Sequence, residues 1–150
     1  MERRKGDTQM ARRIQMIAVD SSVAVKWFSQ EDKTAEALSL RDSHIERTVD
    51  LWITPLLYCE VANALRYKPD YDEKKLAEAL RYLFNLHLNV APIDFSLLSR
   101  AGEIAYDGDV TVYDALPVAL AESQETVCIT ADEETQYRKL KPKNYPIELL

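Results

Sequence analysis

The segment MIAVDSS, residues 16–22, joins a short apolar run to an aspartate and two serines. A continuous apolar run that ends in a polar turn is typical of a buried strand in a parallel sheet. In open α/β sheets, ligands bind beyond the carboxyl ends of such strands. We therefore expect Asp20 to lie at the mouth of a site.

The rest of the chain predicts strands and helices in alternation. Strands are expected at 50–53, 88–92, 126–130 and 145–149, and helices at 21–28, 34–47, 55–68, 72–87, 96–107, 112–122 and 132–140. Thr54 with Pro55, Ser96 and Thr111 mark predicted helix starts, and Gly108 a predicted left-handed stop. This alternation predicts a three-layer α/β/α fold around a central, mainly parallel sheet.

Length and composition indicate one globular domain. The chain has 150 residues, of which 47% are hydrophobic and 29% charged, which is enough to bury a single core without disulfides. We expect residues 14–150 to form the domain and residues 1–13, which are basic and lack an apolar centre, to be a disordered extension.

Charge limits the ways in which the protein could bind nucleic acid. The first fifteen residues carry +3 of a total of −6, which leaves −9 for the remainder. An acidic body argues against a broad phosphate-binding surface, since such surfaces rely on Lys and Arg. Nucleic-acid chemistry would then depend on bound metal and a small basic patch such as residues 138–143.

The cysteine pattern and the hydropathy predict a cytoplasmic protein with no membrane segment. Cys59 and Cys128 are far apart in the sequence, and each has apolar neighbours, so both are expected to be reduced core thiols. No apolar run is long enough to span a bilayer.

Four acidic residues are the candidate site, although each has a structural alternative. Asp20 and Asp132 could each cap a helix, and Asp114 stands three residues after Thr111, as in an imperfect capping box. Glu60 is harder to explain structurally, because it flanks the apolar stripe of its predicted helix.

The collective position of these acids is the stronger argument. They follow strands, or lie in helices that follow strands or turns, at what a parallel sheet makes one edge. Gathered carboxylates repel one another unless a cation neutralises them. All-oxygen ligation indicates Mg²⁺ or Mn²⁺.

Other catalytic patterns are missing from the sequence. With only Gly6, Gly102 and Gly108, the chain has no P-loop and no dinucleotide fingerprint. His44 and His87 stand in helical patterns without a matching ligand or nucleophile, and we expect them to be surface or packing residues.

The acidic segments resemble the four motifs of the PIN domain family. The segments are Val19-Asp20-Ser21-Ser22-Val23 with Lys26-Trp27-Phe28, Glu60-Val61-Ala62-Asn63-Ala64-Leu65, Thr111-Val112-Tyr113-Asp114-Ala115-Leu116, and Ile129-Thr130-Ala131-Asp132. The match runs from about Met16 to Leu150. Within that family, the chain is similar to the VapC toxins of toxin–antitoxin pairs.

The resemblance implies a metal-dependent endoribonuclease. Asp20, Glu60, Asp114 and Asp132 would hold Mg²⁺ or Mn²⁺, and a metal-activated water would attack an RNA phosphodiester. Four further residues would support them: Ser22, Asn63, Thr111 and Thr130. The resemblance also implies a homodimer and a cognate antitoxin that inserts a basic side chain into the acidic groove.

Alternatives remain open at this point. Pro117 is expected to kink the helix that carries Asp114 or to start it, and Glu133 and Glu134 compete with Asp132 for the fourth acidic position. The other functions considered are a non-catalytic PIN-like interaction module, a housekeeping RNA-processing nuclease, and an aspartyl-phosphate protein with Asp20 as its nucleophile.

Overall fold

The protein was analysed as a computed structural model that describes residues 14–150, so the extension predicted at residues 1–13 lies outside the described part of the chain. The strands are β1 (Gln15–Val19), β2 (Val49–Ile53), β3 (Asn89–Val90), β4 (Cys128–Thr130) and β5 (Ile147–Leu149). The α-helices are α1 (Ser21–Val25), α2 (Thr34–Ile45), α3 (Leu56–Arg66), α4 (Glu73–Asn85), α5 (Phe95–Gly108), α6 (Val112–Ser123) and α7 (Arg138–Leu140). Shorter helical segments are the 3₁₀ turns η1 (Lys26–Phe28) and η3 (Lys141–Lys143) and the π-helix η2 (Glu133–Tyr137).

The strands form one sheet in the order β3-β2-β1-β4-β5, and all four pairings are parallel. The central strand β1 pairs Ile17 with Leu51 of β2 on one side and Val19 with Ile129 of β4 on the other. The predicted parallel α/β sheet is therefore confirmed. From β1 the chain runs to β2 and β3 on one side and then crosses to β4 and β5 on the other side. The carboxyl end of β1 is therefore the expected position for a ligand.

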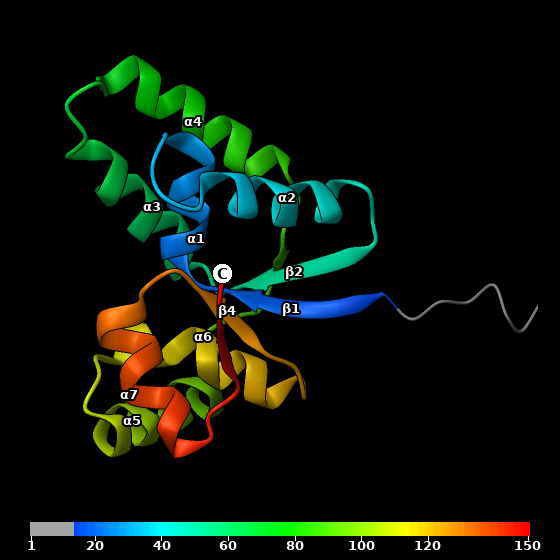
Figure 1. Cartoon of the computed structure of the whole chain (residues 1–150), viewed down its shortest axis with the longest axis vertical. Helices are drawn as coiled ribbons and strands as arrows, with labels where there is room; N and C mark the ends of the chain where they lie inside the picture. Colours follow the sequence, from blue (N-terminus) through cyan, green and yellow to red (C-terminus); the bar gives the residue numbers. More distant parts are fainter. Residues whose placement is uncertain (1–13) are drawn as a thin grey trace, which may run out of the picture.

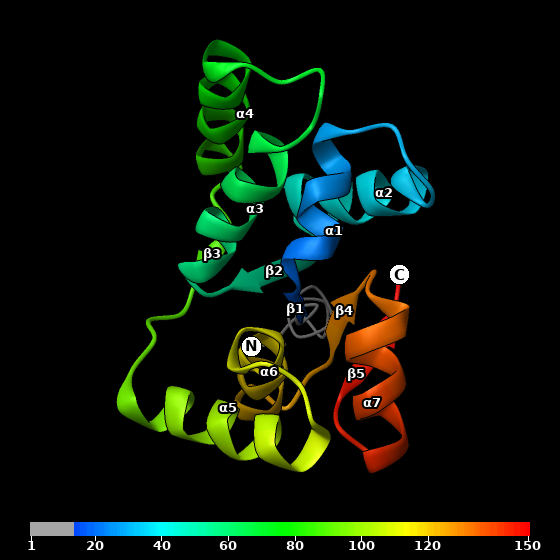
Figure 2. The same ribbon diagram turned by 90° about the vertical axis from the view of Figure 1, so that its left-hand side faces the viewer.

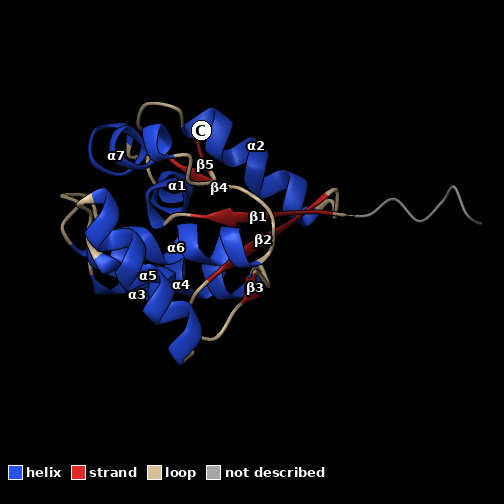
Figure 3. Cartoon of the chain, turned by 90° about the horizontal axis from the view of Figure 1, so that it is seen from below, coloured by secondary structure: helices blue, strands red, loops and turns tan. Residues whose placement is uncertain are grey.

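Helices cover both faces of the sheet. Helices α1 to α4 lie on one face and α5 to α7 on the other, with the short strands between them (Figures 1 and 2). The two resulting cores meet at β1, because Ile17 and Val19 face the first core and Ala18 faces the second. Seen along another axis, the helices surround a narrow sheet with β1 near its middle (Figure 3). The structure thus has the predicted three layers.

Two predicted helix starts are wrong. Helix α3 has Pro55 at its N-cap with no side-chain cap, so Thr54 does not cap it. Helix α5 begins after Asp94, whose carboxylate accepts from the backbone NH of Leu97, and not at Ser96. The aspartate satisfies a free NH group of the first turn two residues earlier than predicted.

Gly108 does not supply a left-handed stop. It is the last residue of α5, and Asp109 takes the left-handed conformation with φ of 54°. The glycine is required for close packing, because a Cβ atom at this position would collide with the side chain of Leu140. The turn thus depends on an aspartate that tolerates positive φ.

Pro117 lies inside α6 and does not start it. The helix runs continuously from Val112 to Ser123, with Thr111 at the N-cap. Asp114 therefore stays in the first turn. The alternative in which it moves to a preceding turn is not observed.

Two smaller expectations have different outcomes. Cys128 is buried, as predicted, but Cys59 is exposed on α3, so the prediction of a core thiol was wrong there. No helix within residues 14–150 is long and apolar enough to cross a bilayer.

Candidate active site

Asp20 is the most deeply buried acid at the carboxyl edge of the sheet. It directly follows β1, only 7% of its surface is exposed, and it caps α1. Its Oδ2 accepts from both the backbone NH, at 3.0 Å, and the hydroxyl of Ser22. Burial raises the pKa of Asp20 above its usual value, and these hydrogen bonds from Ser22 oppose the rise. The predicted capping role is present and uses Oδ2, whereas Oδ1 lies 3.4 Å from Nε2 of Gln136.

Glu60 extends from the middle of α3 towards the same region. It is half-buried, and burial together with the nearby charge of Asp20 raises its pKa to about 7. Asp114 contributes a further, smaller rise. A carboxylate on the flank of an apolar helix face thus approaches two other acids, as the sequence predicted.

Asp114 and Asp132 approach from the opposite half of the sheet. Asp114 is half-buried, and its pKa is raised by burial and then by the charges of Asp20 and Asp132. Asp132 follows β4 and caps η2, where its Oδ1 accepts at 3.0 Å from both the NH and the hydroxyl of Thr135. The four acids therefore lie close enough to influence one another electrostatically, and Asp20 interacts with all three others.

No basic side chain pairs with this group. None of the ion pairs found within residues 14–150 includes Asp20, Glu60, Asp114 or Asp132. Lys139 is a basic residue whose charge lowers the pKa of Asp114 slightly, against the larger rise from burial. The edge of the sheet therefore carries uncompensated negative charge.

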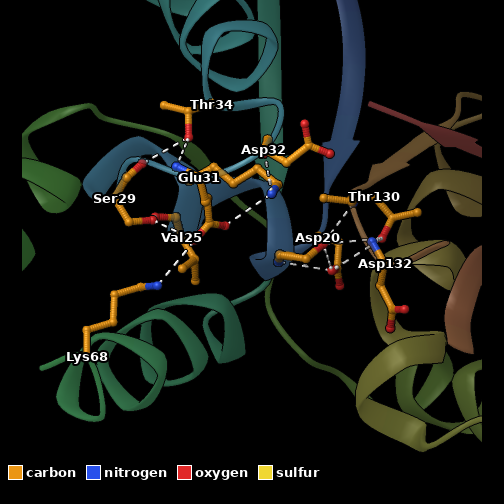
Figure 4. Close-up of polar contacts among 12 residues, drawn as sticks. Asp20, Val25, Ser29, Glu31, Asp32, Thr34, Lys68, Thr130 and Asp132 are labelled. Atoms are coloured by element: carbon orange, nitrogen blue, oxygen red, sulfur yellow. Dashed lines mark hydrogen bonds and ion pairs between the residues drawn. The ribbon is translucent and has the colours of Figure 1, made fainter. Parts of the chain in front are cut away.

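Serine and threonine side chains hold the ends of β1 and β4 together. The Ser22 hydroxyl accepts from the NH of Ala131 at 2.9 Å, and the Thr130 hydroxyl accepts from the NH of Asp132 at 3.0 Å. Figure 4 shows Asp20 facing Thr130 and Asp132 across this junction. Ser22 and Thr130 thus form hydrogen bonds around Asp20 and Asp132, and their role in supporting a metal site stays a prediction.

The other two predicted supporting residues are placed differently. Thr111 caps α6 by accepting from the NH of Asp114 at 3.0 Å. Asn63 is exposed on α3, and its side chain makes no hydrogen bond to any residue in the range 14–150. The supporting role of Asn63 stays a prediction.

One residue in contact with the site was missed from the sequence. Gln136 is fully buried in η2, and its amide contacts Asp20, the carbonyl of Asp114 and the Thr130 hydroxyl. In the sequence it stands in the polar run Glu133-Glu134-Thr135-Gln136, which resembles a solvent-exposed helix face. Nothing in the pattern distinguishes it.

A second polar cluster lies beside the acidic group, where the turn after η1 meets α3. Glu31 accepts from Lys26 at 3.1 Å, from Ser29 at 2.9 Å and from Lys68 at 3.2 Å (Figure 4). Burial opposes ionisation, but these hydrogen bonds outweigh it and lower the pKa of Glu31. Both lysines form their ion pairs with Glu31 and not with the acids near Asp20.

The donor set fits a hard divalent cation. Carboxylate oxygens are the preferred ligands of Mg²⁺ and Mn²⁺, and uncompensated charge favours binding. Within residues 14–150, no three acidic, histidine or cysteine side chains converge on a single metal position. Mg²⁺ commonly uses one or two carboxylates and retains several waters, so Asp20 with one neighbouring acid would be sufficient.

These features define a parallel α/β domain with an acidic site at the carboxyl edge of its central strands. The family model for the PIN domain matches residues 17–141. The chain belongs to the PIN domain family. A comparison with curated proteins gives no significant match.

Solved structures with the same fold include several toxin–antitoxin proteins. VapBC2 from Rickettsia felis, bound to a promoter DNA fragment, aligns with TM-score 0.65 and 12% identity over 91% of this chain and 99% of that chain. VapC20 from Mycobacterium tuberculosis, described as a Sarcin-Ricin loop cleaving toxin, aligns with TM-score 0.66 and 14% identity over 86% of this chain and 95% of that chain. FitAcB from Neisseria gonorrhoeae aligns with TM-score 0.64 and 14% identity over 88% of this chain and 96% of that chain. At these identities the likeness establishes the shared fold.

Proposed function

We propose that this protein is a Mg²⁺- or Mn²⁺-dependent endoribonuclease and the toxin of a toxin–antitoxin pair. The observation that carries the proposal is the group of four acids around Asp20, with no basic partner in the described residues. Membership of the PIN family and the fold shared with toxin–antitoxin proteins support it. The same neighbours favour an antitoxin partner, and the homodimer implied by the motif resemblance is part of the proposal.

In this proposal, Asp20 and one neighbouring acid hold the cation directly, with Glu60, Asp114 and Asp132 as the candidates for that second ligand. The bound ion would supply an activated water and offset the charge that develops on the leaving oxygen. Ser22 fixes the Asp20 carboxylate, and Thr130 fixes the backbone of Asp132. The catalytic unit is residues 14–150, with residues 1–13 as an extension to it.

Substrate binding would depend on few basic groups. Lys139 Nζ donates at 2.8 Å to the carbonyl of Asp109 and remains 40% exposed at its side chain. Its charge reaches Asp114. We propose that Lys139 contacts a substrate phosphate next to the acidic group, consistent with the acidic remainder of the chain.

The test is cleavage of a labelled structured RNA by purified protein with Mg²⁺ or Mn²⁺, compared with chelator and with Asp20→Asn. Asparagine caps a helix as well as aspartate does, so this change keeps the cap of α1 and removes the charge. Asp94→Asn makes the same change at the cap of α5 and is the matched control.

Cleavage that requires metal, is lost in Asp20→Asn and persists in Asp94→Asn would support the nuclease. If folded wild-type protein bound Mn²⁺ in calorimetry but cut none of a varied set of RNAs, the proposal that its substrate is RNA would be wrong. If it neither bound metal nor cut RNA, a non-catalytic PIN module would replace the proposal.

A further inference from the structure

Gln136 has an unusual position for a glutamine. It is 0% exposed and lies in the π-helix η2, immediately after the β4 end of the acidic site. Burying a primary amide is unfavourable unless its donors and acceptor are all satisfied. π-helical turns are rare and are frequently found at functional sites. A polar side chain in this position therefore requires an explanation.

The amide of Gln136 links three segments that carry acids of the site. Its Nε2 donates to the carbonyl of Asp114 at 2.8 Å and lies 3.4 Å from Oδ1 of Asp20. Its Oε1 accepts from the hydroxyl of Thr130, the residue before Ala131 and Asp132. One side chain thus connects the end of β1, the first turn of α6 and the end of β4.

The surroundings fix the orientation of this amide. A carbonyl and a carboxylate are both acceptors, so the nitrogen must face Asp114 and Asp20, and a flipped amide would place oxygen against oxygen. The Thr130 hydroxyl has one hydrogen and lies 3.5 Å from Asp20 Oδ2, but it forms the shorter contact with Gln136. Thr130 therefore donates to Gln136, and the network is directional.

Asp20 is consequently held at both oxygens. Ser22 holds Oδ2 through its NH and hydroxyl, and Gln136 approaches Oδ1. A carboxylate restrained in this way presents its remaining lone pairs in one direction. The carbonyl of Asp114 is fixed by the same nitrogen, so the backbone of a second acid is held relative to the first.

We infer that Gln136 is a positioning residue, which orients the Asp20 carboxylate for the cation and keeps the Asp114 segment aligned with it. This inference rests on the proposed function, because it assigns a role towards the metal of the same site. Residues that hydrogen-bond to metal ligands typically contribute about 10–100-fold to metal affinity.

The experiment is Mn²⁺ calorimetry on folded Gln136→Met, which keeps the chain length and removes the amide. We expect the Kd to rise about 10–100-fold over wild type. Gln136→Asn is the second variant, with an amide too short to make the same contacts, and it is expected to weaken binding in the same direction. The control is Leu140→Ala, which lies four residues later, is also fully buried, and destabilises the core without touching the acids.

RNA cleavage against metal concentration gives a second readout. A positioning role predicts that the metal midpoint of Gln136→Met rises about 10–100-fold and that cleavage recovers at saturating Mn²⁺. A purely structural role would lower cleavage equally at every metal concentration and leave the midpoint unchanged, and that result would overturn the inference.

The outcomes also separate the inference from the proposed function. If the wild type binds Mn²⁺ and cuts RNA while both Gln136 variants retain its Kd, only the positioning role fails. If the Leu140→Ala control weakens metal binding as much as Gln136→Met does, the effect is general loosening and the positioning role fails again. If the wild type neither binds Mn²⁺ nor cuts RNA, the proposed function and the inference fail together.

Discussion

Replacing Glu60 by Gln should stabilise the metal-free protein at pH 8 and leave its stability unchanged at pH 4.5. The physical reason is that burial and the charge of Asp20 raise the pKa of Glu60 from 4.5 to about 7 in the folded state. The folded protein therefore binds this proton more tightly than the unfolded chain. The stabilisation is complete below pH 4.5 and is lost as the pH rises through about 7.

The size of the effect follows from that shift. This rise in the pKa of Glu60 corresponds to a difference of about 3 kcal/mol in the free energy of unfolding, at about 1.4 kcal/mol for each pKa unit. Glu60 is only half-buried, so screening by water reduces the expected gain to about 1–2 kcal/mol. For a protein of this length, that gain raises Tm by about 2–6 °C.

Thermal unfolding in chelator at pH 4.5 and pH 8 measures this difference, with Glu78→Gln on the exposed face of α4 as the matched control. Added Mg²⁺ should reduce the difference at pH 8: for a site with Kd of about 1 mM, 10 mM ion stabilises the wild type by about 1.4 kcal/mol, and Glu60→Gln gains less. The reasoning is refuted if Glu60→Gln is less stable than wild type in chelator at pH 8, or if its advantage is equal at both pH values.

Three further predictions concern other parts of the chain. Gly108→Ala should lower the free energy of unfolding by about 1–3 kcal/mol, because the added methyl group collides with Leu140; a urea midpoint equal to that of wild type would contradict this. His44→Ala should lower it by about 1–3 kcal/mol, because the ring accepts from one backbone NH and lies within hydrogen-bond distance of two carbonyls, and the urea transition should shift without a change of slope. Lys139→Gln should raise KM for RNA and reduce its salt dependence by about one phosphate contact, whereas Lys75→Gln on α4, whose charge is not among those that act on Asp20, Glu60 or Asp114, should leave KM unchanged.

The sequence was informative where one residue type has one physical use. The apolar run before Asp20 can only be buried, so β1 and the acid at its end were predictable, and the parallel pairing follows from the alternation of elements. The position of Asp114 was less predictable, because it lies in α6, which follows α5 and not a strand, and only tertiary packing brings it near Asp20.

Helix ends were harder because several residues compete to satisfy the same free NH groups. Asp94 caps α5 although Ser96 is an equally suitable type, and Asp109 adopts positive φ although a glycine stands next to it. The choice is decided by packing between distant segments, such as Gly108 against Leu140, which local pattern does not contain.

Gln136 shows the same limit within the site. Its neighbours in the chain are polar and exposed, and its burial results from hydrogen bonds to residues up to 116 positions away. The interpretation of His44 as a surface or packing residue missed its structural contacts for the same reason: the NH of Leu51, which it satisfies at 3.1 Å, belongs to a different element.

The division of the acids between the two halves of the sheet also affects synthesis. Asp20 and Glu60 are made before Asp114, Asp132 and Gln136, and β5, which pairs with β4, is made after all of them. Contacts of such long sequence separation form slowly, so a nascent chain that has reached only α4 has half of the acids and no β4 to align them. The four acids can therefore come together only after the segment from α6 to η2 has been made.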